Sequence, residues 1–329
     1  MRNYKPGLVS TVIPVYNRCD MLKEAVQSVL SQTYRPVEIV IVDDGSTDQT
    51  PQIIDGLARE WPSEIRVIHQ DNRGPGLARE AGRLIAKGEF IQYLDSDDAL
   101  LPQKFELQVT GLRQNPYCGV SYGYTRYRYR DGTVGAKPWK GSGIKVMTMF
   151  PSFLRSRWWD TPNPLYRAEV CDKAGPWTNL RQEEDWEYDC RIAALNTKLH
   201  FCPEYVVEVR ERTYAWNSTG RDILKDRARA HKLIIQHARR AGIDDAAPEM
   251  RHFARELFLL SRQCGAAGLV EESQMLFNLA REASGPRRGA CMDFTVYQSL
   301  AGVFGWGIVG KMSCWLDLFW FSNRYPYRI

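Results

Sequence analysis

The chain has 329 residues, 44% of them hydrophobic, and a formal net charge of +5. This length is enough for one large α/β domain with an appendage or for two ordinary domains, and the composition excludes an intrinsically disordered protein. The charge is modest and has no concentrated basic block, so we expect no nucleic acid partner.

The cysteines and the N-terminus bear on where the chain resides. Eight cysteines are scattered without a Cys-x-x-Cys pair, which zinc and redox sites use, so we interpret them as reduced, mostly buried thiols. Residues 1–6 lack the apolar segment of a secretory signal. We therefore expect a cytoplasmic protein.

Strand and helix signals alternate through the first hundred residues. Apolar runs predict strands at residues 8–17, 37–42, 65–69 and 90–94. Helical spacing of apolar residues predicts helices at 20–31 and 50–59, and a glycine-rich loop at 72–79 leads into another. This alternation is typical of a doubly wound, mainly parallel sheet.

Polar or glycine-rich turns follow these strands at their carboxyl ends, where open α/β sheets bind ligands. The turn after the fourth strand carries Asp95, Asp97 and Asp98, whose charges repel one another unless a cation lies between them. Carboxylate oxygens suit a hard divalent ion such as Mg²⁺ or Mn²⁺. The alternative is a solvated acidic turn before the next helix.

Two nucleotide-binding folds lack their motifs here. A dinucleotide-binding domain requires Gly-x-Gly-x-x-Gly directly after the first strand, where this chain has Pro14-Val15-Tyr16-Asn17. A P-loop is absent because no glycine-rich turn ends in Gly-Lys-Ser or Gly-Lys-Thr. Acidic turns in place of glycine-rich phosphate cradles indicate that phosphates are held through a metal.

Four motifs occur in order along the chain: Val12 to Asn17, Val42 to Asp48, Gly74 to Arg79 and Asp95 to Asp98. In order and spacing they resemble the family 2 glycosyltransferases with the GT-A fold. The resemblance covers about residues 7 to 215. It implies a Rossmann-like catalytic domain over residues 1–220 that uses a nucleotide sugar.

The resemblance implies roles for residues of the first two turns. Pro14 and Tyr16 would lie beside the base of the nucleotide, and Asp44, with Asp43 as its neighbour, would accept a hydrogen bond from a base N–H. The alternative for Asp43 and Asp44 is an ordinary Asx-turn, which the following Gly45 and Ser46 also allow.

The resemblance also implies a diphosphate and metal site. Arg79 would lie near the diphosphate, Asp95 would face the ribose and sugar, and Asp97 would bind Mn²⁺ or Mg²⁺, with Asp95 as a further candidate ligand. The alternative for Arg79 is an exposed arginine paired with a nearby glutamate. Glu80 departs from the family, in which an asparagine is usual.

A second acidic cluster resembles the family's Glu-Asp-Trp segment. By this resemblance Asp185 is the general base that takes the proton of the acceptor hydroxyl, with Glu184 as the alternative, while Glu183 leaves the register open by one residue. Acidic residues are also favoured in the first turn of any helix. Upstream, Trp158 and Trp159 are candidates for the acceptor side or for core packing.

Two further segments bear on the domain. Many relatives carry a histidine after a late strand that can join the metal site, but Val206 to Asn217 has none and His200 comes too early. Either the metal has fewer protein ligands here, or Arg210 and Arg212 hold the diphosphate instead. The alternating tyrosines of 122–129 predict a pair of strands with a turn at Asp131-Gly132.

The C-terminal third reads as an α-helical extension. Helical patterns at 223–241, 247–264 and 270–283 predict a helical domain over residues 221–285. Residues 286–329 combine aromatic, apolar and basic residues, and their longest apolar stretches are too short to span a bilayer. We expect this tail to lie on the inner face of the plasma membrane; a helix packed on the helical domain or in a dimer is the alternative.

These features predict a metal-assisted, inverting glycosyltransferase. The donor would be a nucleotide-diphosphate sugar, with a UDP-sugar expected, and the acceptor a hydroxyl of a glycan or lipid-linked molecule. A non-catalytic nucleotide-sugar-binding or scaffold protein of the same fold is the competing hypothesis. A nucleotidyltransferase would need a glycine-rich, basic loop after the first strand, which is missing.

Overall fold

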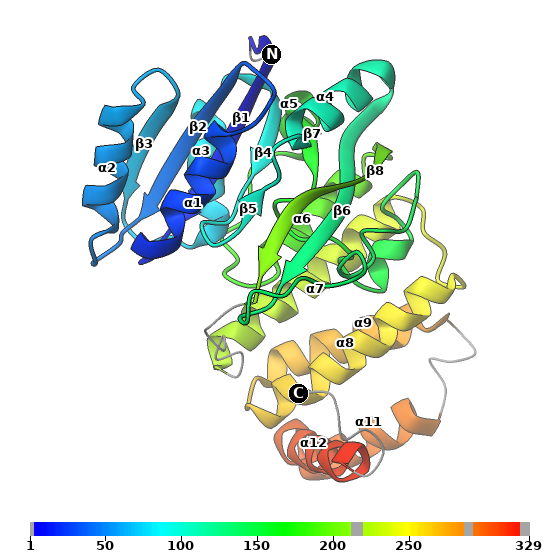
Figure 1. The fold of residues 1–329 in the computed structure, drawn as a ribbon. Coiled ribbons are helices and arrows are strands. Elements are labelled where there is room, and N and C mark those ends of the chain that lie inside the picture. Colours follow the sequence, from blue (N-terminus) through cyan, green and yellow to red (C-terminus); the bar gives the residue numbers. More distant parts are fainter. Residues whose placement is uncertain (1–2, 212–219, 286–291, 323–329) are drawn as a thin grey trace. The chain divides into compact units, whose positions relative to one another are not determined.

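The computed structural model describes residues 3–211, 220–285 and 292–322, with side chains up to Leu316 in the last range. The chain forms two compact units, and each is described by itself. The first contains the sheet and comprises residues up to Met149 and from Arg157 to the end of the last strand (Figure 1). The second contains Phe150–Ser156 and the C-terminal helices.

The first unit is built on one eight-stranded sheet with the order β3-β2-β1-β4-β7-β6-β8-β5. The strands are β1 Lys5–Val15, β2 Val37–Asp44, β3 Ile65–Gln70, β4 Gly88–Tyr93, β5 Ala99–Leu100, β6 Cys118–Arg128, β7 Leu165–Arg167 and β8 Lys198–Arg210. Strands β1 to β4 are parallel, whereas β7 is antiparallel to both β4 and β6. The predicted doubly wound α/β fold is confirmed, with a mixed sheet.

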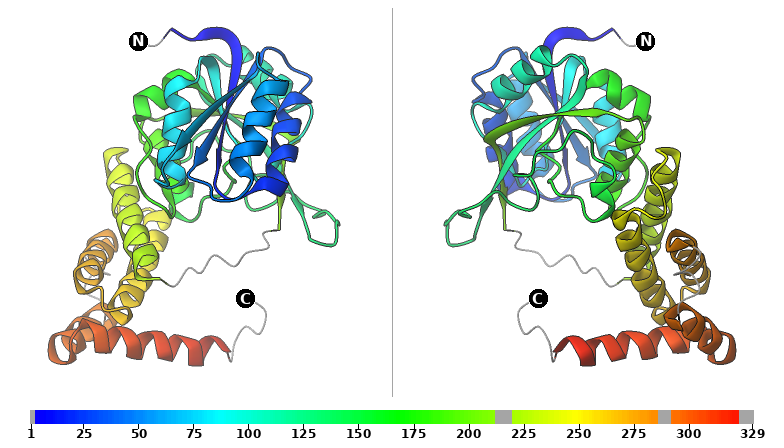
Figure 2. Two further views of the ribbon diagram at one scale, coloured as in Figure 1. Left: turned by 90° about the vertical axis from the view of Figure 1, so that its left-hand side faces the viewer. Right: turned by 90° about the vertical axis from the view of Figure 1, so that its right-hand side faces the viewer.

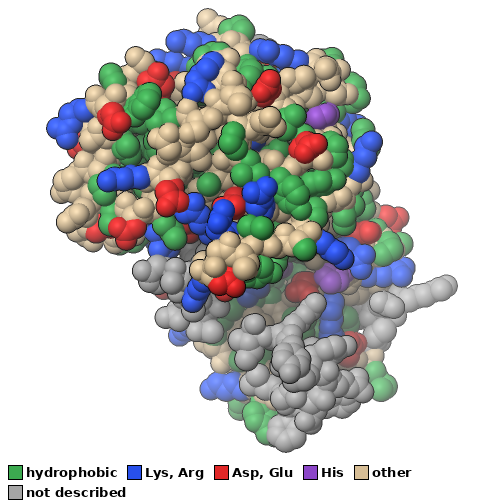
Figure 3. All heavy atoms as spheres, viewed as in Figure 1, with side chains coloured by type: hydrophobic (Ala, Val, Ile, Leu, Met, Phe, Trp, Pro, Cys, Tyr) green, Lys and Arg blue, Asp and Glu red, His purple; other side chains and the backbone are tan. Residues whose placement is uncertain are grey.

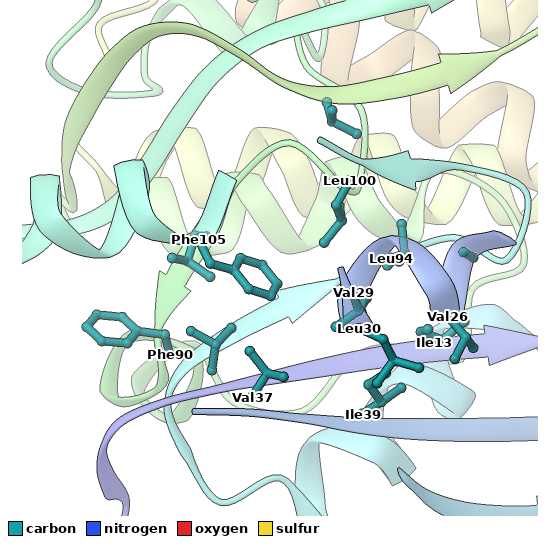
Figure 4. Close-up of a cluster of buried hydrophobic side chains, with 14 of the residues drawn as sticks. Ile13, Val26, Val29, Leu30, Val37, Ile39, Phe90, Leu94, Leu100 and Phe105 are labelled. Carbon is teal, nitrogen blue, oxygen red and sulfur yellow. The ribbon is translucent and has the colours of Figure 1, made fainter. Parts of the chain in front are cut away.

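Helices cover both faces of this sheet. The helices of the first unit are α1 Cys19–Leu30, α2 Thr50–Glu60, α3 Pro75–Ile85, α4 Lys104–Gln114, α5 Ala168–Ala174 and α6 Glu184–Ala193. Figure 2 shows α1 and α2 on one side of the sheet and α3 on the other. Val26 of α1, Ile54 of α2 and Phe105 of α4 belong to one buried cluster, part of which Figure 4 shows.

The alternation of inward and outward residues explains this arrangement. Residues of β1 at odd positions, such as Ile13, point into the cluster in Figure 4, whereas Val12 packs against α3 on the opposite face. Both β1 and β2 are therefore apolar on both sides, as strands sandwiched between helix layers must be. On the visible surface of this unit, apolar, acidic and basic side chains are interspersed (Figure 3).

The prediction of two strands around Asp131-Gly132 is wrong. Residues 118–128 form one strand, β6, and β8 pairs with it in parallel along its whole length. The segment after the turn contributes an isolated bridge between Arg128 and Val134 and single hydrogen bonds such as Gly135 N–H to Tyr127 O, but no second strand.

The second unit is helical. It contains α7 Arg221–Arg240, α8 Pro248–Ala266, α9 Val270–Ala283, α11 Met292–Phe304, α12 Trp306–Ser322 and a short 3₁₀ helix, η1 Ser152–Leu154. Phe153 and Leu154 are fully buried, and η1 packs against α8. Among the described residues, none of the helices is long and apolar enough to cross a membrane.

Two helical glycines allow a paired test of the packing. A Cβ on Gly82 of α3 would collide with Val12 Cγ1 of β1, whereas a Cβ on Gly56 of α2 would meet nothing within 4 Å. We expect Gly82→Ala to lower the free energy of unfolding by about 1–3 kcal/mol through overpacking. Gly56→Ala should raise it by about 0.5–1 kcal/mol through helix propensity. Urea unfolding monitored by circular dichroism measures both, and equal effects would contradict the described packing of α3.

Candidate active site

The turns after β1 and β2 are hydrogen-bonded to each other. The Asn17 N–H donates to Ser46 Oγ at 2.9 Å, and the Thr47 N–H donates to Asn17 Oδ1 at 2.8 Å. Pro14 is buried within β1, while Tyr16 is 48% exposed. Of the two residues predicted beside the nucleotide base, only Tyr16 therefore offers an open surface.

The two acidic residues at the end of β2 differ in their surroundings. Asp44 accepts hydrogen bonds from Gln70 Nε2 and from the N–H groups of Arg73 and Gly74, at 2.7–2.8 Å, so it anchors the loop before α3. Asp43 accepts the Ser46 N–H at 3.0 Å, which is the Asx-turn alternative.

Asp43 also contacts a histidine of the neighbouring strand. Its Oδ2 lies 3.1 Å from His69 Nδ1, and this hydrogen bond raises the pKa of His69 despite partial burial. The carboxylate of Asp43 retains more acceptor capacity than that of Asp44, because a carboxylate offers about four lone-pair sites. We therefore regard Asp43 as the better candidate for a base N–H.

Arg79 links the acidic turn after β4 to the start of α6. Its Nη2 donates to Asp95 Oδ1 and its Nη1 donates to Glu184 Oε1, both at 2.7 Å, and the guanidinium lies 5.0 Å from the centre of the Trp177 ring. The side chain is only 5% exposed. Burial alone would lower the pKa of Arg79, but Asp95 and Glu184 raise it.

Arg79 is a buried residue with two carboxylate partners, and not an exposed one. The exposed-arginine alternative is wrong because the side chain is buried, and both terminal nitrogens are already engaged by carboxylates. Glu80, the departure from the family pattern, forms a two-pronged ion pair with Arg83 and accepts the Trp177 N–H at 3.2 Å. It therefore packs α3 against the segment before α6.

The three acidic residues after β4 converge. Carboxylate oxygens of Asp95, Asp97 and Asp98 lie within 4.8 Å of one another. An all-oxygen donor set of this size fits Mg²⁺ or Mn²⁺. Asp98 is buried and also accepts the Arg210 N–H at 3.3 Å, which ties the end of β8 to this turn.

The two neighbouring acids at the start of α6 have different environments. The side chain of Glu184 is 9% exposed and that of Asp185 is 27% exposed. Burial and the adjacent Asp185 raise the pKa of Glu184. Burial also acts to raise the pKa of Asp185, but the charges of Arg157, Arg79 and Lys140 outweigh it and lower the pKa to about 2.

Arg157 is a site residue that the sequence did not reveal. Its Nη1 donates to Asp185 Oδ2 at 2.7 Å and its Nε donates to Asp189 Oδ2 at 2.8 Å. An arginine before two tryptophans matches none of the motifs considered. A usable signal was the spacing of Asp185 and Asp189, which places two carboxylates on one helix face where a cation is expected.

Trp158 and Trp159 lie in the core. Trp159 is fully buried and donates its Nε1–H to Asp189 Oδ2 at 2.9 Å, and Trp158 is 7% exposed. Their rings pack against each other and against Tyr122. The structure thus agrees with the core-packing alternative, since neither ring face is open for an acceptor sugar.

The remaining basic candidates differ in where they lie. His200 Nδ1 lies 2.9 Å from Ser121 Oγ, and its ring packs against Gly111 of α4. It therefore belongs to the packing between β6, β8 and α4. Arg210 adjoins the acidic turn through its backbone, whereas Arg212 lies outside the described residues.

The fold and the site together define a class. Acidic turns gathered at the carboxyl edge of a doubly wound sheet, with a further acidic pair at the start of a later helix, are the arrangement expected of a GT-A glycosyltransferase. The model of the family "Glycosyl transferase family 2" matches residues 10–167. These residues, just under half of the chain, are similar to the family 2 glycosyltransferases.

Similar proteins agree with this assignment. An uncharacterized glycosyltransferase of Nostoc sp. is 33% identical over 171 residues, which cover 51% of this chain and 53% of that protein. Glycosyltransferase GlyG of Streptococcus pneumoniae is 37% identical over 126 residues, covering 38% of this chain and 42% of its own. The chain thus spans about half or less of the length of these curated relatives.

Solved structures share the fold over nearly the whole chain. The crystal structure of S. aureus TarS residues 1–349 with UDP superposes with a TM-score of 0.65 at 21% identity, covering 97% of this chain and 93% of that one. The structure of GalNAc-T7 with UDP, GalNAc and Mn²⁺ gives a TM-score of 0.53 at 20% identity, covering 76% and 50%. At these identities the likeness establishes the GT-A fold alone.

The buried bridge made by Arg79 can be tested through stability. Arg79→Met keeps most of the volume but leaves Asp95 and Glu184 without their shared cation, so we expect the free energy of unfolding to fall by about 3–5 kcal/mol. As a control, Lys173→Ala removes an exposed pair with Glu169 and should cost less than about 1 kcal/mol. Urea unfolding near neutral pH measures both, and similar losses would refute a buried bridge.

Proposed function

We propose that this protein is an inverting glycosyltransferase that moves a sugar from a nucleoside-diphosphate donor to an acceptor hydroxyl. One observation carries the proposal: the guanidinium of Arg79 joins Asp95 of the donor-side turn to Glu184, the neighbour of the candidate base, with two 2.7 Å hydrogen bonds. Donor-side and acceptor-side carboxylates are thereby held at one site.

In this mechanism Asp185 is the general base. Its carboxylate takes the proton of the acceptor hydroxyl while the hydroxyl oxygen forms a bond to the anomeric carbon. The bond from that carbon to the diphosphate oxygen breaks on the opposite side, so the configuration inverts and the nucleoside diphosphate leaves. The low pKa of Asp185 keeps its carboxylate ionised and ready to accept the proton.

Donor binding is assigned to the other turns. The exposed ring of Tyr16 offers a flat surface for the base, and Asp43 offers acceptor oxygens for a base N–H. Asp97 and Asp95 would hold Mn²⁺ or Mg²⁺, which when bound stabilises the negative charge of the leaving diphosphate. The similar TarS structures are complexes with UDP and UDP-GlcNAc, and we therefore propose a UDP-sugar as donor.

The acceptor is proposed to be a hydroxyl of a glycan or lipid-linked molecule, used at a membrane surface. Helices α11 and α12 expose large apolar side chains, among them Val303 at 76% and Trp315 at 60%. A groove of about 630 Å³ between α8, α11 and α12 is lined mainly by apolar residues, including Phe258 and Leu300. Exposed aromatic and aliphatic residues are typical of interfacial helices.

Charge favours an anionic bilayer as the partner of this surface. Residues 286–329 contain five basic and two acidic residues: Arg287, Arg288, Lys311, Arg324 and Arg328 against Asp293 and Asp317. Basic residues close in sequence to an apolar segment strengthen its binding to anionic lipid headgroups.

A donor panel tests the enzymatic proposal. Purified protein is incubated with nucleotide sugars, Mn²⁺ or Mg²⁺ and candidate acceptors, and the release of nucleoside diphosphate is followed. We expect turnover with a UDP-sugar, a loss of about 10²–10⁴-fold in kcat for Asp185→Asn, and loss of metal-dependent donor binding for Asp97→Ala. Asp131→Asn, in an exposed turn, is the control. Donor binding with no turnover under any of these conditions would favour the non-catalytic alternative.

Vesicle flotation tests the membrane proposal separately. We expect the full chain to float with vesicles of phosphatidylcholine and phosphatidylglycerol more than with phosphatidylcholine alone. The double variant Val303→Glu/Trp315→Glu should float less, because it places charges on the apolar surface. Leu84→Glu is the control, because Leu84 is an exposed leucine of α3 and does not belong to α11 or α12. Equal flotation of all three proteins would reject membrane contact through α11 and α12.

A further inference from the structure

The hydrogen bonds of Asp185 occupy its two oxygens unequally. Oδ2 accepts from Arg157 Nη1 at 2.7 Å and from Thr161 Oγ1 at 3.1 Å, while Oδ1 accepts only the Trp186 N–H at 2.7 Å. A carboxylate oxygen has about two lone-pair sites. Within the described part of the chain, Oδ2 is therefore filled and Oδ1 keeps one site open.

The guanidinium of Arg157 is also bonded to a second carboxylate, that of Asp189. Its Nε donates to Asp189 Oδ2 at 2.8 Å, and Asp189 is fully buried. Asp189 also accepts the Trp159 Nε1–H at 2.9 Å and the Tyr166 hydroxyl at 2.6 Å. A carboxylate fixed by three donors in the core leaves the guanidinium of Arg157 little freedom to move.

We propose that Arg157 is a positioning residue for the transfer reaction: anchored by Asp189, it holds Asp185 Oδ2 so that Oδ1 is the oxygen that receives the acceptor's proton. This inference rests on the proposed function, in which Asp185 is the base. It assigns Trp159 a role through Asp189 and Arg157 rather than through contact with a sugar.

The charges that face Asp185 decide how the inference can be tested. Arg157, Arg79 and Lys140 act to keep Asp185 ionised, whereas burial and the adjacent Glu184 oppose ionisation. Lys140 forms an ion pair with Asp160, and Arg79 forms ion pairs with Asp95 and Glu184. Arg157 divides its charge between Asp185 and Asp189 and contacts Asp185 directly. Its removal is therefore expected to raise the pKa of Asp185.

The sign of the pH effect follows. The wild-type carboxylate stays ionised down to about pH 2. In Arg157→Gln the carboxylate protonates at a higher pH, because an opposite charge at this distance accounts for roughly 1–3 pH units. A shift of this size puts the pKa of Asp185 in the variant at about 3–5, so the ratio of wild-type to variant kcat/KM should stay constant above about pH 6 and grow as the pH falls from about 6 to about 3.5. A ratio cancels the titration of groups common to both proteins.

The experiment compares three variants of the full chain. Arg157→Gln should lower kcat about 10-fold or more at pH 7 and further at about pH 3.5, with the donor KM little changed. Arg157→Lys keeps the charge but cannot bind two carboxylates at once, so we expect a decrease in kcat that does not depend on pH. Arg191→Gln breaks a comparable two-pronged pair with Glu187 on the same helix and should leave the pH profile unchanged.

Several outcomes would overturn the inference. A folded Arg157→Gln with a pH-independent ratio, or with the same profile as Arg191→Gln, means that Arg157 has only a structural role. If Arg157→Gln is unfolded by circular dichroism, Thr161→Val and Arg157→Lys decide, and wild-type kcat in both would reject the inference. An inactive wild-type protein with every donor instead rejects the proposed function, so the two failures are distinguishable.

Discussion

The buried guanidinium of Arg79 is the interaction on which the site depends. Two carboxylates that are far apart in sequence, Asp95 and Glu184, can lie close together in a desolvated place only if a cation is between them. The cation–π contact with Trp177 adds a third fixed direction. The side chain of Arg79 therefore fixes both the acidic turn and the start of α6.

The same logic separates the two adjacent acids of α6. Glu184 turns inward to Arg79, whereas Asp185 turns to Arg157 and keeps part of its surface exposed. Neighbouring carboxylates that share a helix start thus acquire different pKa values because each meets a different arginine. Environment divides the work between them, as it does in many enzymes with paired carboxylates.

Most of the fold could be predicted from the sequence because its signals are local. Strand and helix periodicity located β1 to β4 and the helices α7 to α9 within a few residues. The part that failed is the strand after Asp131. The main partner of β6 is β8, about 70 residues further along, and the segment after the turn forms only an isolated bridge with β6. A local alternation pattern carries no information about such a distant partner.

For the candidate site, the sequence pointed to residues but not to their contacts. Motifs indicated Asp95, Asp97, Asp185 and Arg79, but not which partners their side chains choose. Asp44 anchors a loop, and the paired tryptophans pack in the core, because burial and long-range hydrogen bonds decide these matters. Arg157 belongs to no motif, and its importance became visible only when the fold brought it to Asp185 and Asp189.

Residues 150–156 belong to the helical unit, and this affects how the first unit can be prepared as a separate fragment. A fragment ending before α7 would retain Phe153 and Leu154 but lose α8, against which η1 packs. Each of these side chains would then expose apolar surface worth about 1.5–3 kcal/mol. The next residue in the chain is Arg157. The helical unit, although it holds none of the proposed catalytic residues, therefore contains the segment that directly precedes Arg157 in the chain.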